Sequence, residues 1–192
     1  METRTFSPTP VTVQSNEFVH TAINQFSSAV LTMKSVEDLE PLVVTLWVEL
    51  QTLGLNLDYC GINIFHESSK TTDFYGVHQK GLLTARAIPF SCCLLCDGLP
   101  TLDEALQCFK KGQPLHYHAS TIELHDWTER ISKLGIQVTG PLPPLMEEKI
   151  HLVDIPFSRG TISMGRRGED TFDQQTITIA QSFAQIDRKS VV

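Results

Sequence analysis

The sequence has no long apolar run, no excess of basic residues and no segment that resembles an export signal. No apolar stretch approaches the roughly 18 residues that a membrane-spanning helix needs, so we expect no membrane partner. The 22 acidic residues outnumber the 15 basic ones and give a net charge of −7, which argues against nucleic acid as a partner. The first residues lack a basic segment followed by an apolar core, so we expect a soluble protein of the cytoplasm.

The sequence lacks an even set of cysteines: it has five, an odd number, which suits a reducing compartment better than a disulfide framework. Three of them cluster in Cys92-Cys93-Leu94-Leu95-Cys96, and Cys108, His116 and His118 follow. Thiolates at Cys-x-x-Cys spacing can hold zinc if other Cys or His side chains complete the tetrahedron. Adjacent thiols can instead form a reversible disulfide, or they can be small buried apolar side chains. A lone Cys-x-x-Cys favours the last interpretation, and we predict no metal site.

The length and composition predict one folded domain. A chain of 192 residues with 41% hydrophobic content can bury one sizeable core and is short for two. Residues 1–14 are rich in Thr, Pro and Ser, and such a segment buries too little apolar surface to offset its ordering entropy. We therefore predict a tail over 1–14, a single domain over 15–188 and a short tail over 189–192.

Apolar periodicity predicts helices at the start of this domain and strands in its middle. Apolar residues repeat at three and four positions up to Met33, which indicates a helix that begins at Ser15 or Asn16. A capping box at Ser35 opens a second helix that runs to about Leu53. The patterns that follow predict strands over 59–66, 71–79, 82–90 and 114–118 and helices over 102–111 and 122–134.

The most informative stretch is 147–184. Residues 150–155 are apolar on both faces, which indicates a strand covered from both sides, and we expect Pro156 to end it because proline has no N–H donor. Residues 158–160 predict a turn whose glycine takes a positive φ. Residues 161–164 then alternate polar and apolar, as a half-buried returning strand does.

A Gly/Arg loop and a final helix complete this stretch. Thr171 or Asp173 can cap the helix, whose apolar residues recur at helical spacing. The strand that ends in Ile-Pro-Phe, the glycine turn, the short strand, the Gly/Arg loop and the Phe172 that opens the last helix resemble the C-terminal half of a GAF domain. GAF domains are ligand-sensing modules of signalling proteins.

The resemblance covers nearly the whole chain from about Asn16 and implies an α+β fold of the profilin-like and PAS-like type. Its central sheet is expected to be largely antiparallel, with the N- and C-terminal helices together on one face and the middle helices and loops over the other. The ligand pocket belongs under these middle elements.

As a function, the resemblance implies a sensory domain that is not an enzyme. It is expected to bind a small molecule, to form a homodimer through its terminal helices, or both, and to regulate an effector such as a histidine kinase, a cyclase or a phosphatase in signal transduction, including two-component systems. Ligand burial under the middle loops is expected to shift the packing of the terminal helices. The residues do not identify the ligand, and the cofactor is unknown.

Several chemistries known for GAF domains can be compared with these residues. Copies that bind cyclic nucleotides carry an Asn-Lys pair before the last Phe and an acidic pair after it, whereas Gly165-Arg166-Arg167 and Gln174-Gln175-Thr176 stand here. Copies that attach a bilin use a Cys followed directly by His, which does not occur. Haem could use His116 or His118 as an axial ligand only if its strand face points inward. Some stand-alone copies reduce free methionine sulfoxide with pocket cysteines, and such a thiol-dependent redox enzyme is our alternative, together with a Cys/His metal sensor.

The candidate ligand-binding residues are polar or aromatic side chains that interrupt otherwise apolar faces, because a few polar groups in an apolar pocket can orient a small ligand. In the 59–66 strand, we expect Cys60, Ile62 and Ile64 to face helices and the alternate residues to face the pocket. Each candidate can also be an ordinary structural residue. The candidates are Asn63, Phe65, Tyr75, His116, His118, Trp127, Thr161 and Ser163. Arg159, Arg166 and Arg167 beside the last strand either are solvated or neutralise an anionic ligand.

Overall fold

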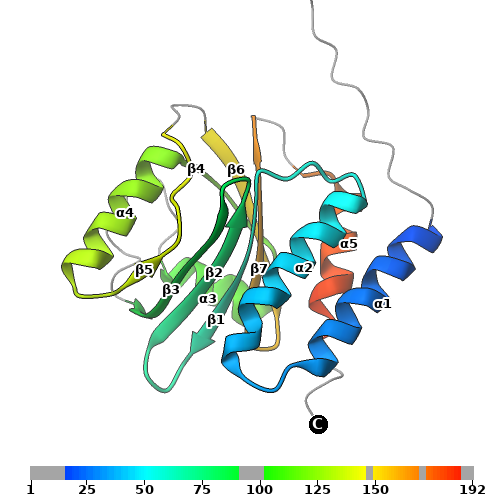
Figure 1. The fold of residues 1–192 in the computed structure, drawn as a ribbon, viewed down its shortest axis with the longest axis horizontal. Coiled ribbons are helices and arrows are strands. Elements are labelled where there is room, and N and C mark those ends of the chain that lie inside the picture. The colour runs from blue at the N-terminus through cyan, green and yellow to red at the C-terminus, as the bar shows by residue number, and fades with distance from the viewer. Residues whose placement is uncertain (1–15, 91–101, 146–148, 169–171, 187–192) are drawn as a thin grey trace, which may run out of the picture.

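The computed structural model describes residues 16–90, 102–145, 149–168 and 172–186, and in this part the helices surround one seven-stranded sheet (Figure 1). The helices are α1 (Asn16–Thr32), the 3-10 helix η1 (Val36–Asp38), α2 (Leu39–Thr52), α3 (Leu102–Lys111), α4 (Thr121–Lys133) and α5 (Gln174–Ala184). The strands are β1 (Tyr59–His66), β2 (Thr71–His78), β3 (Gly81–Pro89), β4 (Leu115–Ser120), β5 (Val138–Thr139), β6 (Lys149–Phe157) and β7 (Gly160–Arg167). The predicted tails 1–14 and 189–192 lie outside the described residues.

The sheet has the strand order β4-β6-β7-β1-β2-β3-β5, and its strands pair antiparallel. Hairpins join β1 to β2, β2 to β3 and β6 to β7, because these strands follow one another closely in the chain. At the centre of the sheet, Ile62 of β1 lies opposite both Tyr75 of β2 and Ile162 of β7. The first and last strands of the domain are therefore neighbours, and the 147–184 stretch completes a sheet that the first half of the chain begins.

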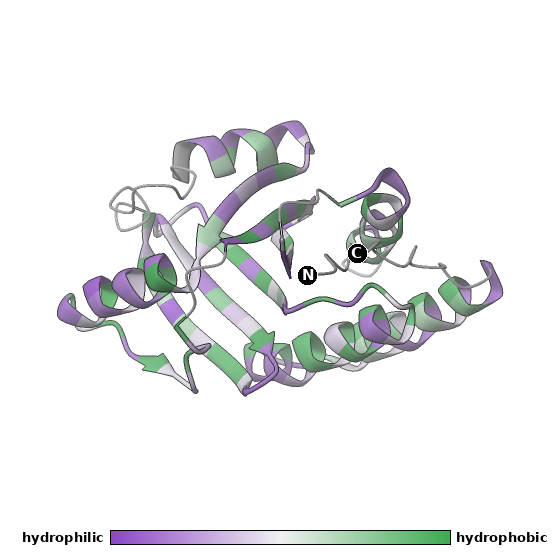
Figure 2. Cartoon of the chain, turned by 90° about the horizontal axis from the view of Figure 1, so that it is seen from above, coloured by the Kyte–Doolittle hydropathy of each residue, from purple (hydrophilic) through white to green (hydrophobic). Residues whose placement is uncertain are grey.

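The helices cover the sheet in two groups (Figure 1 and Figure 2). α1, α2 and α5 pack on one face, where Leu46, Leu50, Met164 and Phe183 are almost fully buried in the main core. Each such side chain contributes about 1.5–3 kcal/mol to stability by leaving water. A smaller core on the other face joins Ala85 and Ile88 of β3 to Trp127 and Ile131 of α4. None of the helices in the described residues is long and apolar enough to cross a membrane.

This architecture confirms the α+β, GAF-like layout that the resemblance implies, with the terminal helices on one face of an antiparallel sheet and the middle helices over the other. The predicted helix boundaries agree with the structure within two residues. At η1, the Ser35 N–H donates to Asp38 Oδ2 over 3.0 Å, and Gly54 ends α2 with φ near 79°. Asp173 caps α5, because its Oδ1 accepts the Thr176 N–H over 2.7 Å.

Three details of the last hairpin differ from the prediction. β6 continues through Pro156 to Phe157, because its pairing with β4 ends at Asp154 and leaves a strand edge where proline is tolerated. β7 is buried on both faces, so it is not the half-buried strand that its alternation suggested. Gly160 does not take a positive φ; a Cβ there would lie 1.7 Å from the Asn63 carbonyl oxygen of β1. The glycine is needed for close approach of two strands, which a local turn pattern does not reveal.

The two-residue strand β5 was not predicted.

Candidate functional site

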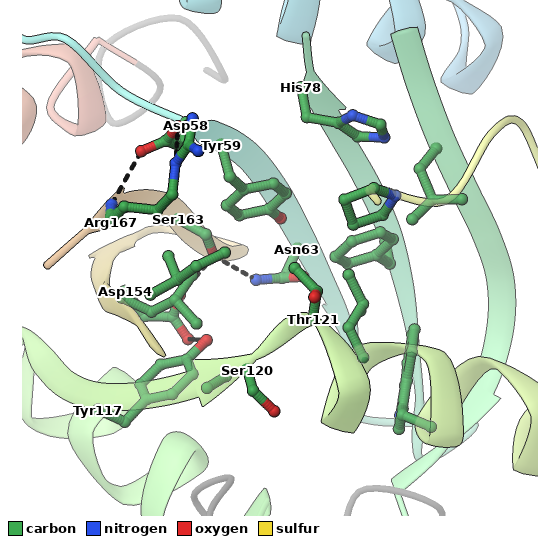
Figure 3. A pocket seen from close by; sticks show the side chains of 18 of the residues that line it. Asp58, Tyr59, Asn63, His78, Tyr117, Ser120, Thr121, Asp154, Ser163 and Arg167 are labelled. Carbon is green, nitrogen blue, oxygen red and sulfur yellow. Dashed lines mark hydrogen bonds and ion pairs between the residues drawn. The ribbon is translucent and has the colours of Figure 1, made fainter. Parts of the chain in front are cut away.

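A cavity of about 290 Å³ lies on the sheet face that α3, α4 and the loop 140–145 cover (Figure 3). Residues of β1, β2, β3, β4, β6, β7, α3 and α4 line it, so it draws on the centre of the sheet and on both covering helices. Most of its lining is apolar, as is usual for small-molecule sites. The apolar lining includes Phe65, Phe74, Leu83, Ile88, Leu124, Trp127, Ile150 and Leu152.

Aromatic rings form one wall of this cavity. The Phe74 ring stacks on Tyr59 at 6.3 Å between centroids and contacts Trp127 edge-on at 5.7 Å. The Tyr59 ring can lie flat on the sheet because Gly61 and Gly76 leave room for it. A Cβ on Gly61 would be 2.0 Å from Tyr59 Oη, and one on Gly76 would be 2.8 Å from Tyr59 Cε2. Two glycines in adjacent strands therefore place a phenol in the wall.

A line of hydrogen-bonded polar side chains crosses the floor of the cavity (Figure 3). Asn63 Nδ2 donates to Thr161 Oγ1 over 2.9 Å and to Ser163 Oγ over 2.8 Å. The Ser163 hydroxyl in turn donates to Asp154 Oδ1, and the Tyr117 hydroxyl donates to Asp154 Oδ2 over 3.4 Å. Four strands supply these residues, and the hydroxyl groups of Ser163 and Tyr117 both donate to one buried carboxylate.

Asp154 is the electrostatic centre of the site. Burial raises the pKa of this carboxyl group to about 6, although the hydrogen bonds from Ser163 and Tyr117 oppose the shift. The carboxylate is therefore charged at neutral pH and becomes neutral in mild acid. A buried charge with only hydroxyl partners is costly, and a cation or an N–H donor from a ligand would lower that cost.

The Tyr59 hydroxyl is a second buried polar group of the site that lacks a good hydrogen-bond partner. Its oxygen is buried and makes no hydrogen bond of normal geometry among the described residues, although the Ser163 hydroxyl is near enough to oppose the rise of its pKa. Burial, and then the nearby Asp154 carboxylate, raise the pKa of Tyr59 well above its usual value, so the group stays a neutral donor. Figure 3 shows the phenol end of Tyr59 close to Asn63 and Ser163. Buried polar groups without partners are rare in folded proteins and mark sites that deserve a functional explanation.

Charged and imidazole groups hold the rim of the cavity in place. Arg167 contacts Asp58 Oδ1 through Nη2 at 2.6 Å and through Nε at 2.7 Å. His78 Nε2 donates to the Pro141 carbonyl over 2.9 Å, and His78 Nδ1 accepts the Lys80 N–H over 3.2 Å. The His78 ring thus fastens the loop 140–145 to β2 through Nε2, while Nδ1 holds the turn between β2 and β3.

Four predicted site residues line the cavity: Asn63, Phe65, Trp127 and Ser163. Thr161 is not part of the wall, but its hydroxyl belongs to the same polar line through Asn63. The predicted division of β1 into two faces is also found, since Cys60 and Ile62 lie in the main core.

Tyr75 was placed on the wrong face. It pairs with Ile62 across β1 and β2, and it is fully buried in the core under the terminal helices. There the Arg86 guanidinium lies 5.6 Å from the centre of its ring. Successive residues of a strand point to opposite faces, so Phe74 takes the pocket position that we assigned to its neighbour.

His116 and His118 were also placed on the wrong face. In β4, Tyr117 and Ala119 line the cavity, so the two histidines point toward the layer that contains α5. They stack on His151 of β6 at 5.4 and 4.9 Å between ring centroids, and His151 in turn lies 5.2 Å from Phe172. Neither can be an axial haem ligand in this cavity.

Asp154, Tyr59 and Tyr117 are site residues that we did not predict. The signal for Asp154 was present, because a carboxylate between Val153 and Ile155 interrupts a strand that is apolar on both faces. Tyr59 was assigned to the pocket face but not chosen. Tyr117 could be found only with the correct face of β4, which pairing with β6 fixes.

The structure tests the interpretations of the cysteines only for two of the five residues. Cys92, Cys93 and Cys96 lie outside the described residues. Cys60 and Cys108 are free thiols, and neither lines the cavity. Among the residues that the structure describes, no group of three or more His, Cys, Asp or Glu side chains is placed to hold a metal ion.

Comparison with known proteins adds little about chemistry. No protein-family model matches the sequence, and no curated protein sequence matches it. Among solved structures, the chain is similar to the GAF domain from Acinetobacter phosphoenolpyruvate-protein phosphotransferase, at 11% sequence identity and a TM-score of 0.49. That similarity covers 92% of this chain and 96% of the other. A likeness at this level concerns the fold and carries no information about ligands.

Proposed function

We propose that this chain is a non-catalytic sensory domain that binds a small molecule in the cavity beneath α3, α4 and the loop 140–145. The observation that carries the proposal is the buried polar line that ends on Asp154 inside aromatic walls. A polar network of this kind weakens an isolated core, so its presence is best explained by a ligand that completes it.

The chemistry of the site defines a class of ligand. The aromatic wall formed by Tyr59, Phe74 and Trp127 suits a flat, largely apolar molecule. Asp154 favours a cationic nitrogen or an N–H donor on that molecule, and the unpartnered Tyr59 hydroxyl favours an acceptor such as a carbonyl or ring nitrogen. The cavity volume of about 290 Å³ suits a ligand of one or two rings.

The polar groups of the site support binding rather than catalysis. The hydroxyl nearest to a base is that of Ser163, and the base is a carboxylate whose other oxygen already accepts from Tyr117. His78 uses both ring nitrogens in structural hydrogen bonds, so it is not poised to move a proton. Cys60 lies on the opposite face of the sheet, where burial raises the pKa of its thiol and makes it a poor nucleophile.

The site can be tested with a pair of flat probes that differ in charge. Benzamidinium places a planar cation on a ring, and benzoate places an anion on the same ring. We expect benzamidinium, at millimolar concentration and pH 7.5, to raise the melting temperature of the protein in a thermal-shift assay, and we expect benzoate to leave it unchanged. The Asp154→Asn variant should lose the response because it lacks the charge. Equal responses to the two probes, or an undiminished response in the variant, would contradict the assignment of Asp154.

The signal is proposed to pass through the sheet to the terminal helices. β6 and β7 place Asp154 and Ser163 in the cavity, while Val153 and Met164 on their other faces pack in the core next to α5. A ligand that draws these strands together would bias the packing of α5 against α1, provided that it binds the two arrangements with different affinities. The effector is proposed to be a signalling protein such as a histidine kinase, a cyclase or a phosphatase.

Homodimerisation through the terminal helices is part of this proposal. Phe18 and Leu31 of α1 and Val48 of α2 are exposed apolar side chains on the helical layer. We expect small-angle scattering at micromolar concentration to give the mass of a dimer, and a Phe18→Glu variant to give that of a monomer. Ile122→Glu, at an exposed apolar position of α4 on the other side of the sheet, is the matched control. A wild-type protein that remains monomeric with and without ligand would refute the dimer.

A further inference from the structure

A second cavity lies on the opposite face of the sheet and has no role in the proposed sensing site. It has a volume of about 570 Å³ and lies where the C-terminal ends of α1 and α5 meet the ends of β1 and β7, at the lower end of the molecule in Figure 1. Most of its lining is apolar. The main apolar contributors are Val30, Ile62, Ile64, Phe157, Ile162 and Phe183.

The rim of this cavity carries charge of mainly one sign. Arg159, in the turn between β6 and β7, is exposed, and no side-chain partner for it is found within the described residues. Lys34, in the connection after α1, lies on the same rim and is partly offset by the nearby Asp38 carboxylate. Besides these two cations, the polar lining consists of Ser35, His66 and Asp73, and the remaining lining residues are apolar.

The one carboxylate on the rim is already satisfied. Asp73 Oδ2 lies 3.1 Å from His66 Nε2, and Asp73 Oδ1 accepts the Ala87 N–H over 2.7 Å. Both oxygens of Asp73 are hydrogen-bonded but its negative charge remains, so two cations and one carboxylate line the rim. The side chains that line the rim leave a net positive field at the mouth of an apolar cavity.

We propose that this second cavity binds an aliphatic carboxylate of medium chain length, with its hydrocarbon among the isoleucines and its head group at Arg159. An apolar pocket with a cation at its mouth complements an amphiphilic anion better than it complements any other simple class of ligand. The chain of such a ligand would lie against Val30 of α1 and Phe183 of α5.

A ligand in this second cavity would contact α1 and α5, the helices whose packing is proposed to carry the signal. Phe26 of α1 contacts Phe183 of α5 edge-on, with 5.4 Å between ring centroids, and both rings line the cavity. A hydrocarbon chain next to them adds contacts to α1 and α5 together and holds the two helices in one arrangement. The site is thus an allosteric input from the opposite face, and its existence does not depend on the first cavity.

Isoleucine methyl groups distinguish the two cavities in one experiment. Ile62, Ile64 and Ile162 line the second cavity, whereas Ile88 and Ile150 line the first. We expect sodium decanoate, added below its micelle concentration to protein with ¹³C-labelled isoleucine methyl groups, to shift the NMR signals of the first three. Shifts confined to Ile88 and Ile150, or no saturable shift at all, would overturn the proposal.

Charge recognition is tested with one further ligand and two variants. Decanol has the same chain length without the carboxylate and is expected to bind more weakly. Arg159→Ala should weaken decanoate binding by about fivefold, the size expected for an exposed ion pair. Arg130→Ala removes an exposed arginine of α4 on the other side of the sheet and should leave the affinity unchanged. Equal affinity of decanoate for wild type and Arg159→Ala would refute the assigned head-group position.

Discussion

Replacement of Asp154 by asparagine is expected to stabilise the fold at neutral pH while it removes the recognition of cationic ligands. The carboxyl group has an ordinary pKa of 3.8, and burial raises it to about 6 in the folded protein. A difference of this size corresponds to about 3 kcal/mol between the two protonation states. Asparagine has nearly the same shape and no charge, so it avoids the cost of burying a carboxylate with only hydroxyl partners.

The pH dependence of the free energy of unfolding shows whether the Asp154 carboxylate destabilises the fold. Between pH 4 and 6 the folded state of the wild type holds a proton that the unfolded state has lost, so its free energy of unfolding falls as the pH rises. Below pH 4 both states are protonated, and the group contributes nothing. The advantage of the variant should therefore grow by about 2–3 kcal/mol from pH 4 to pH 7.5. Other groups also titrate in this range, which makes the difference between variant and wild type the quantity of interest.

Urea denaturation of both proteins at pH 4.0, 5.5 and 7.5 measures this difference. Asp126→Asn, at an exposed position of α4, is the matched control and should show no pH-dependent gain. A variant that is less stable than wild type at pH 7.5 would mean that the Asp154 carboxylate is a net stabilising group. The site would then have no unmet charge for a ligand to neutralise.

The elements that the sequence predicts well are those whose patterns are local. α1 and α2 each have a stripe of apolar residues, the capping box of Ser35 and Asp38 opens the segment η1–α2, and β1 alternates clearly enough to show which face meets the core. Asn63 and Phe65 were found because they lie on the other face of that strand. The aromatic residue Trp127 was found because the apolar stripe of α4 points it inward.

The predictions that failed depend on a register that a single strand does not contain. In β2, Phe74 and Tyr75 are adjacent large aromatics, so alternation alone does not decide which one faces the cavity. In β4 the face was also undetermined: His116 and His118 were predicted to face the cavity, and Tyr117 between them faces it instead. Pairing with β1 and β6 resolves both cases, and that pairing joins residues far apart in the sequence. The residue pattern within one strand does not indicate which strand it pairs with or in which register.

The requirement for glycine at position 160 has the same long-range origin and gives the largest destabilisation that we expect. Gly160 lies opposite Ile64 of β1 and Phe157 of β6, so its backbone is held from both sides. A Cβ at this position would lie 1.7 Å from the Asn63 carbonyl oxygen and 2.8 Å from its carbonyl carbon. These are backbone atoms of a central strand, and they cannot turn away as the end of a side chain can.

Gly160→Ala should therefore lower the free energy of unfolding by about 3 kcal/mol, at the upper end of the usual cost of overpacking, because β7 and β1 must separate. Gly165→Ala in the same strand is the control. Its Cβ would lie 3.1 Å from the ends of the Ile150 and Leu152 side chains and 3.2 Å from Tyr59 Cβ, so these neighbours need to give by only a few tenths of an ångström and we expect a loss below about 1 kcal/mol. Urea denaturation at pH 7.5 measures both. Equal losses in the two variants would show that β1 yields as easily as a side chain, and Asn63 would then not be held rigidly in the cavity floor.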